Sequence, residues 1–414
     1  MKRYLALLLA CLLLCTTACQ KASVSGGDDV PADPPANGTV TDPDGSSGND
    51  TDPDGSGNSG SGESDGSDKP ISIRITAVGD NLLHDSVSYT AQQADGSFDY
   101  SVLYDKIADV FQGSDIAFIN QEVMLTDQVS AYPSIAAKGE CADALKEVGF
   151  NVINLATNHS LDKGVSGLET CLQNVHDRKF EAVIGAFRTK EESTQQIILE
   201  KQGIRFGFLS YTYGINGSGL PSGKEWMISK IDEAKIRREV AALRTQCDYL
   251  IVSMHWGAEY QDTQNKQQEK QAALLAELGV DLVIGTHPHV LQPAVWYDRP
   301  DGGKMYCVYS LGNFISNQRK WATMLGGVLD MTLEFDAQGN LLQVVDAGII
   351  PTVTHYELVA ANTTRGHKVY LLQDYTQQLA ESHGIRNWAG EMKLNWLQNH
   401  AAAVLQDQQR TWQK

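Results

Sequence analysis

The sequence predicts an α/β fold that is built on a parallel or mixed β-sheet. From residue 71 onward, short apolar runs rich in β-branched residues alternate with amphipathic stretches of helical period. Strands and helices that alternate along a chain indicate a sheet covered by helices. After about residue 300 the pattern becomes mostly strand, and the last fifty residues have a helical pattern.

The predicted elements are short, and the first strand shows its pattern most clearly. Its sequence, ISIRITAV, alternates apolar and polar residues as a half-buried strand does. The predicted strands cover residues 71–78, 115–120, 151–156, 203–211, 249–254, 281–285, 304–311, 328–335 and 341–350. The predicted helices cover residues 100–111, 142–148, 166–178, 230–244, 264–278, 369–380 and 392–405.

Residues 1–19 have the pattern of an export signal. Lys2 and Arg3 precede an almost unbroken apolar run over residues 5–14, which is too short to span the ~30 Å of a membrane core. Small residues then lead to Cys19, as in a bacterial lipoprotein signal, although Thr16 stands where such signals usually have Leu. We expect a lipid anchor at Cys19 and a location outside the cytoplasm at the cell membrane. Ordinary secretion and an uncleaved anchor are the alternatives.

Residues 20–69 are predicted to be a disordered linker. They consist almost wholly of Asp, Gly, Ser, Pro, Asn and Thr, and TDPDGS occurs at residues 41–46 and again at 51–56. The segment has ten Asp and one Glu against two Lys, so about half of the formal net charge of −18 lies in it. The remainder of the chain is mildly acidic. This charge excludes a nucleic-acid groove, which needs a basic face.

Polar residues of chemical interest lie where the predicted strands end. In open α/β sheets the carboxyl ends of the strands line one crevice, so these side chains are expected to converge. Carboxylates, an amide and imidazoles without a thiolate suit Mn²⁺, Fe or Zn²⁺. The residues are Asp80, His84, Glu122, Asn158, His159, His255, His287 and His289. The other histidines are expected to be ordinary core or surface residues: His176, His355, His367, His383 and His400.

Six motifs in order carry a resemblance to a known family. They are GDNLLH (79–84), NQE (120–122), ATNHSLDKG (156–164), HWGAEY (255–260), GTHPHVLQ (285–292) and SLGNF (310–314). Together, over about residues 72–350, they resemble the bacterial capsule-synthesis CapA family, the poly-γ-glutamate biosynthesis proteins with a PGA_cap domain. That family is similar to the calcineurin-like metallophosphoesterases. The resemblance therefore implies a four-layer α/β/β/α sandwich with a site for two divalent transition metal ions.

The resemblance also implies a role for each matching residue. Glu122 would bridge the two ions, and His159 would face the substrate as an acid or charge stabiliser. The Asp-x-His block of the phosphoesterases is missing, because Asn81 and Leu82 follow Asp80; His84 therefore either reaches a metal or faces the substrate. The implied ligands are Asp80 and His289 for the first ion, and Asn158, His255 and His287 for the second.

Three further residues are expected near the site. Asp162 and Glu259 would orient the imidazoles or contact the substrate, with solvated loop carboxylates as the alternative. Asn313 would have a site role or would be a turn residue.

The length of 414 residues allows two domains, or one large domain with appendages. We expect the signal over residues 1–19, the linker over 20–69, a CapA-like metallophosphoesterase-type domain over 70–355 and a helical C-terminal extension over 356–414.

Two functions stay open from the sequence. The first is a surface-anchored, metal-dependent hydrolase that acts on a phosphoester or on an amide of an anionic polymer, in capsule or poly-γ-glutamate biosynthesis or processing. The second is a non-catalytic component that binds this polymer beside a membrane synthase. A structural lipoprotein with a relict site is disfavoured, because the ligand set is complete.

Overall fold

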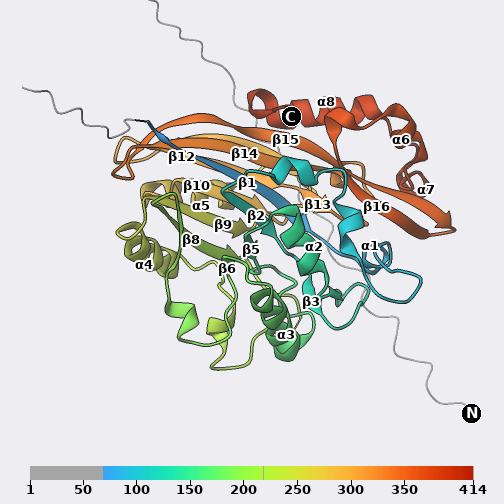
Figure 1. Cartoon of the computed structure of the whole chain (residues 1–414), viewed down its shortest axis with the longest axis horizontal. Coiled ribbons are helices and arrows are strands. Elements are labelled where there is room, and N and C mark those ends of the chain that lie inside the picture. The colour runs from blue at the N-terminus through green and yellow to red at the C-terminus, as the bar shows by residue number, and fades with distance from the viewer. Residues whose placement is uncertain (1–68, 218, 414) are drawn as a thin grey trace, which may run out of the picture. The chain divides into compact units, whose positions relative to one another are not determined.

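Two β-sheets lie face to face, and helices cover their outer surfaces (Figure 1). The computed structural model describes residues 69–217 and 219–413, which belong to one unit that extends over Gly66–Lys414. The predicted signal, the lipidation site Cys19 and the predicted linker up to residue 68 lie outside the described residues. Among the residues described, no helix is both long and apolar enough to cross a membrane.

The first sheet has eight strands, with β1 near its middle. On one side of β1 the strands run parallel to it in the order β2, β5 and β6, and on the other side β14, β15 and β16 are antiparallel neighbours in turn. The short strand β13 pairs with the end of β1. The bounds are β1 Ile71–Asn81, β2 Ile116–Asn120, β5 Val152–Asn154, β6 Ala182–Ile184, β13 Asn313–Ile315, β14 Leu325–Phe335, β15 Leu341–Ala360 and β16 Thr363–Leu371.

The second sheet has six strands in the order β11-β12-β10-β9-β8-β7. Its four inner strands are parallel, and an antiparallel strand flanks them at each edge. The bounds are β7 Ile197–Lys201, β8 Ile204–Thr212, β9 Tyr249–His255, β10 Leu282–Thr286, β11 Leu291–Asp298 and β12 Lys304–Leu311. A separate pair, β3 (Met124–Thr126) and β4 (Ala136–Lys138), completes the described strands.

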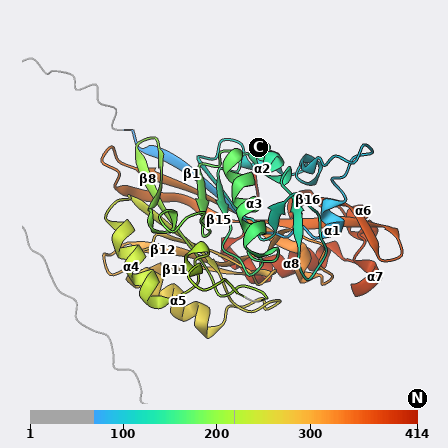
Figure 2. The same ribbon diagram turned by 90° about the horizontal axis from the view of Figure 1, so that it is seen from below.

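Four of the described helices form the two outer layers, and Figure 2 shows α4 and α5 on one side and α2 and α3 on the other; α6 and α8 instead pack against the core between the sheets. The helix bounds are α1 Asp85–Ser88, α2 Cys141–Val148, α3 Gly164–Asp177, α4 Glu233–Arg244, α5 Lys266–Glu277, α6 Gln377–Ser382, α7 Arg386–Ala389 and α8 Leu394–Leu405. An Asn265 capping box begins α5, and Gly149, with φ of 116°, ends α2.

Alternate residues of the strands fill separate apolar cores. In β9, Tyr249 and Ile251 join Ile75 of β1 in the core between the sheets. Leu250 and Val252 face the opposite way and join the core beneath α4 and α5. A third core lies between the first sheet and α2 and α3. Three apolar cores between four layers confirm the predicted α/β/β/α sandwich. The four cysteines of the described ranges, Cys141, Cys171, Cys247 and Cys307, are buried and free.

Two expected helices are wrong in part. Residues 100–111 form two 3₁₀ turns, Tyr100–Leu103 and Ala108–Phe111, instead of one helix. The predicted helix over residues 369–380 overlaps β16, and the helical structure begins only at a 3₁₀ turn, Leu372–Asp374, followed by α6. The boundary expected at residue 355 also falls inside β15. The pairing of β15 with β16 extends the first sheet beyond this boundary.

Two glycines allow the strand ends to approach other backbone closely. A Cβ at Gly79 would lie 2.0 Å from the carbonyl oxygen of Gly312, and a Cβ at Gly285 would lie 2.0 Å from that of Tyr309. No side chain fits at either position. These approaches hold the residues that follow, Asp80 and Thr286, at fixed places at the ends of β1 and β10.

Candidate metal centre

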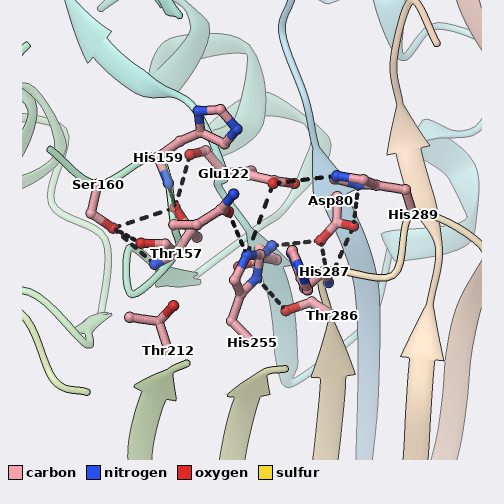
Figure 3. Close-up of polar contacts among 12 residues, drawn as sticks. Asp80, Glu122, Thr157, His159, Ser160, Thr212, His255, Thr286, His287 and His289 are labelled. Carbon is pink, nitrogen blue, oxygen red and sulfur yellow. Dashed lines mark hydrogen bonds and ion pairs between the residues drawn. The ribbon is translucent and has the colours of Figure 1, made fainter. Parts of the chain in front are cut away.

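The ends of β1, β9 and β10 bring carboxylates and imidazoles together in one crevice. Figure 3 shows His255, His287 and His289 gathered around Asp80 and Glu122 above the tips of the strands. Three overlapping groups place one ligand atom of each residue within 4.8 Å of the others: Glu122, His255 and His287; Glu259, His287 and His289; and Asp80, Glu122 and His289.

Asp80 is fully buried at the end of β1, where three donors hold its carboxylate. Asn120 Nδ2 donates to Oδ1 at 2.8 Å, and the backbone N–H of His287 lies 3.2 Å from the same oxygen. His289 Nδ1 lies 3.0 Å from Oδ2. Asp80 therefore connects β1 to β2 and to the loop after β10, and it fixes the orientation of the His289 ring.

Glu122 is equally buried, yet neither of its carboxylate oxygens has a hydrogen-bond partner. The nearest imidazole nitrogens, His255 Nε2 and His289 Nε2, lie 3.9 Å and 3.8 Å from Oε1. His287 Nδ1 is also buried without a partner. An unpaired buried carboxylate costs several kcal/mol, which a cation bound between these atoms would offset. The donor set of oxygens and imidazole nitrogens therefore fits a divalent metal.

His255 ends β9 and contacts two polar side chains. Its Nδ1 lies 3.0 Å from Thr286 Oγ1, and its Nε2 lies 2.9 Å from Asn158 Oδ1. The Thr286 contact sets the orientation of the ring. It leaves Nε2 directed toward Asn158 and Glu122, the side from which a metal would be bound.

The loop after β10 holds its two histidines in left-handed backbone conformations. His287 has φ of 96° and His289 has φ of 60°. Residues with a Cβ rarely adopt such angles, and strain of this kind gathers at functional sites. Pro288 separates the two histidines, and their ring centroids are 5.8 Å apart.

Burial and neighbouring charges set the protonation of the histidines. Burial and the His289 imidazole lower the pKa of His287 to about 3. Burial, with His287 next, lowers the pKa of His255 well below its usual value. Burial also lowers the pKa of His289, but the carboxylates of Glu122 and Asp80 outweigh it and raise this pKa to about 9. His255 and His287 are thus neutral at pH 7, as metal ligands must be.

The pKa of the Glu122 carboxyl is shifted as well. Burial and the Asp80 carboxylate raise the pKa of Glu122 well above its usual value. Both shifts, on Glu122 and on His289, mean that the two carboxylates favour a bound positive charge. In the absence of metal that charge is a proton, which His289 holds next to Asp80.

His159 lies at the wall of the crevice and is oriented by Asp162. Its Nδ1 is 2.7 Å from Asp162 Oδ2, which also accepts the backbone N–H of Ile135. Nε2 is the ring nitrogen left for a ligand in the adjoining pocket, which His159 lines. This places Asp162 as the partner that orients an imidazole.

His84 lies beside the centre but outside the three groups of candidate ligands. Its Nδ1 lies 3.2 Å from both the backbone nitrogen of Asn317 and the backbone oxygen of Leu82. Burial and His289 lower its pKa to about 4. Its position outside the three groups favours the substrate-facing alternative over a metal ligand.

The remaining predicted residues take different positions. Asn313 is buried in β13 and contacts His289, with its Oδ1 3.2 Å from Nδ1 and its Nδ2 donating to the backbone oxygen. Glu259 is exposed, and its carboxylate belongs to a candidate ligand group with His287 and His289. Glu259 is therefore a candidate ligand itself, beyond the orienting role expected for it.

The sequence did not single out three residues that contact the centre. Asn120 and Thr286 hydrogen-bond to Asp80 and His255, and the ring of Tyr213 lies 4.5 Å from that of His287. Asn120 and Thr286 lie within two of the six motifs, NQE and GTHPHVLQ, and both are the last residues of buried strands. Tyr213 follows β8 without any comparable signal.

Two facing sheets with a crevice of histidines and carboxylates at their strand ends define an α/β/β/α sandwich protein with a candidate metal site. Residues 74–318 match the family Bacterial capsule synthesis protein PGA_cap, and the chain belongs to this family. The resemblance drawn from the six motifs is thereby confirmed.

Two relatives of the chain are capsule proteins of Bacillus. The PGA biosynthesis protein CapA of Bacillus subtilis (strain 168) is 29% identical over 264 residues, which are 59% of this chain and 64% of that relative. The capsule biosynthesis protein CapA of Bacillus anthracis is 27% identical over 262 residues, 59% of this chain and 60% of that one. The chain thus matches less than two thirds of the length of either relative.

Among solved structures, a 5'-nucleotidase precursor from Thermus thermophilus is similar with a TM-score of 0.43 and 13% identity. The match covers 81% of this chain and 58% of that one. A likeness at this TM-score adds nothing to the assignment of a reaction.

The geometry predicts that the protein binds a divalent transition metal through the loop after β10. Replacing both His287 and His289 by Ala removes two nitrogens that no other described side chain replaces, so the bound metal should be lost. The metal content of protein purified without chelator, measured by elemental analysis, checks this. The variant should keep its circular dichroism, and a His176→Ala variant, altered on the outer helix α3, should keep its metal. Full metal content in the double variant would show that the site is wrong.

Metal binding is also predicted to release a proton from the crevice. Because the pKa of His289 is raised to about 9, its ring is protonated at pH 7 and must lose that proton to bind a metal. Zinc binding should release protons near pH 7, and the affinity should rise with pH up to about 9. Calorimetric titration in two buffers of different ionisation enthalpy measures this release. Glu122→Gln removes one of the charges that raise this pKa and should reduce the release; an unchanged release in the variant contradicts the assignment.

Proposed function

We propose that the protein is a metal-dependent hydrolase of phosphoesters that acts in the synthesis or processing of a bacterial capsule. The observation that carries the proposal is the buried Glu122 carboxylate, without a partner, beside Asp80 and three imidazoles. Such a set is suited to two divalent ions, of which Mn²⁺, Fe and Zn²⁺ are the candidates. The proposed role in capsule or poly-γ-glutamate synthesis is based on the names of the two Bacillus relatives.

The chain's own residues account for the rest of the proposed reaction. Divalent ions, when bound, supply Lewis-acid charge that polarises a phosphoryl group. His159 donates a proton from Nε2 to the leaving oxygen, because Asp162 holds its Nδ1 and leaves Nε2 free for the substrate. His84 faces the substrate with Nε2, because its Nδ1 contacts the backbone. A water molecule from the adjoining pocket attacks the phosphorus atom as the leaving oxygen takes the proton of His159.

The proposed hydrolysis is tested with 4-nitrophenyl phosphate and bis(4-nitrophenyl) phosphate in the presence of Zn²⁺, Mn²⁺ or Fe²⁺. Turnover should require a metal. His159→Gln should lower kcat/KM by about 10²–10⁴, the range typical of a general acid. Glu122→Gln should lower it further, because the metal charge provides more than the proton does. His176→Gln, on the surface of α3, is the matched control and should keep full activity.

Two results would decide against the proposal. If the metal-bound protein hydrolyses neither ester, the non-catalytic alternative remains, in which the crevice binds the capsule polymer beside membrane synthase proteins. If Glu122→Gln and His159→Gln both retain full activity, the hydrolysis arises elsewhere.

We further propose that the protein is exported and anchored in the cell membrane by a lipid on Cys19. The support is the signal pattern of residues 1–19, and diacylation at this cysteine would give the two chains that stable anchoring needs. Residues 20–69 would then separate the crevice from the membrane, on the order of 40 Å for a flexible chain.

The anchor is predicted to be dispensable for chemistry and required for location. Cys19→Ala should move the protein from the membrane fraction to the soluble exported fraction. Deleting residues 26–66 should leave metal content and hydrolysis of the model esters unchanged, because no proposed site residue lies there, while it impairs capsule formation. Cell fractionation and capsule staining measure these effects. If the shortened protein supports the capsule fully, the spacer role is excluded.

A further inference from the structure

A cavity of about 670 Å³ opens beside the metal centre. The residues that line it come from the segments around Tyr132, His159 and Tyr213, together with Glu259. Its floor includes Asn158 and His159, two residues of the proposed active site. A volume of this size is typical of sites for ligands of one or two rings. The cavity is therefore placed to receive the part of a substrate that lies beyond the reacting phosphoryl group.

Hydrogen bonds join the loops that line the cavity, so the fold holds its walls in place. Ser134 Oγ donates to the backbone oxygen of Asp162, and the Asp162 carboxylate accepts the N–H of Ile135. The backbone N–H of Asn216 donates to the carbonyl oxygen of Asn158 at 2.7 Å. Each loop is thus tied to the segment that carries Asn158 and His159.

The charges of the walls exclude an anionic occupant. Asp162 and Glu259 contribute carboxylates, and no lysine or arginine is among the described residues that line the cavity. Each residue of poly-γ-glutamate carries a carboxylate, which these walls would leave uncompensated. An ammonium group lacks a free partner too, because Asp162 is paired with His159 and the backbone of Ile135, and Glu259 is a candidate metal ligand. A neutral group avoids both costs.

The side chains at the opening offer flat aromatic faces and hydrogen-bond acceptors. Tyr132 and Tyr213 are 74% and 48% exposed, unusual values for large aromatic residues. Glu259 and Asn216 are exposed beside them. Tyrosine supplies a rigid, amphipathic contact surface, and carboxylate and amide oxygens accept from hydroxyl groups. Faces of this kind with several acceptors suit the apolar face and the hydroxyl groups of a sugar ring.

We propose that this cavity binds a neutral, hydroxyl-rich sugar unit. This inference rests on the proposed function, because the sugar carries the phosphoryl group held at the metal centre. The substrate class is then a sugar phosphate or a phosphate-linked glycan. The anionic capsule polymer itself does not occupy this cavity. Tyr132 and Tyr213 are specificity residues for the sugar, and Glu259 and Asn216 accept its hydroxyl protons.

Binding is tested apart from hydrolysis, by saturation-transfer difference NMR on the Zn²⁺-loaded protein. The probes are maltose, cellobiose and N,N′-diacetylchitobiose, with tri-γ-glutamate as the anionic comparison. At least one disaccharide should receive saturation. Tyr132→Ala should weaken its binding about fivefold, since an aromatic contact contributes on this scale, and Tyr132→Phe should retain it. Tyr89→Ala is the control, because Tyr89 is an exposed tyrosine (37%) outside the cavity.

The outcomes separate the two proposals. Sugar binding that depends on Tyr132 supports the inference, even if the model esters are not hydrolysed and the hydrolase proposal fails. Hydrolysis without binding of any of the three disaccharides overturns the inference alone. It is equally overturned if Tyr132→Ala leaves sugar binding unchanged, or if tri-γ-glutamate binds and Tyr132→Ala abolishes that binding.

Discussion

Two carboxylates buried in one crevice are the constraint on which the rest of the structure depends. Asp80 and Glu122 are at most 1% exposed and come from the ends of neighbouring parallel strands. Asp80 is stabilised by three donors, whereas Glu122 has none. A fold that keeps both buried must supply positive charge between them. The neutral imidazoles of His255 and His287 face this place because β9 and β10 end beside β1.

The sequence predicted this centre better than its surroundings. A period-2 apolar run shows where a strand ends, so Asp80, His255 and His287 could be placed at one edge before their contacts were known. The environment of His84 could not be predicted, since it depends on the backbone N–H of Asn317, 233 residues away. The same holds for Tyr213, whose position follows from the conformation of a loop.

Secondary structure was mispredicted where distant pairing overrides the local pattern. Strand β16 is held by β15, and its residues 369–371 have an apolar pattern that also fits a helix. Residues 100–111 have a helical period but form two 3₁₀ turns, one of which begins at the Asp99 cap. The first segment is part of the first sheet and the second packs against it, and the shape of that sheet is not visible in a short window of sequence.

Strand β14 shows that the segment matching the family and the folding unit are different stretches of chain. The family match ends at residue 318, whereas β14 begins at Leu325 and pairs with β1 from Ile71 to Val78. Without β14, the strand that carries Asp80 would become an edge with a row of unpaired backbone groups, a template for aggregation. An expression fragment trimmed to the family match would therefore keep all the proposed ligands and lose the strand that supports the first of them, Asp80.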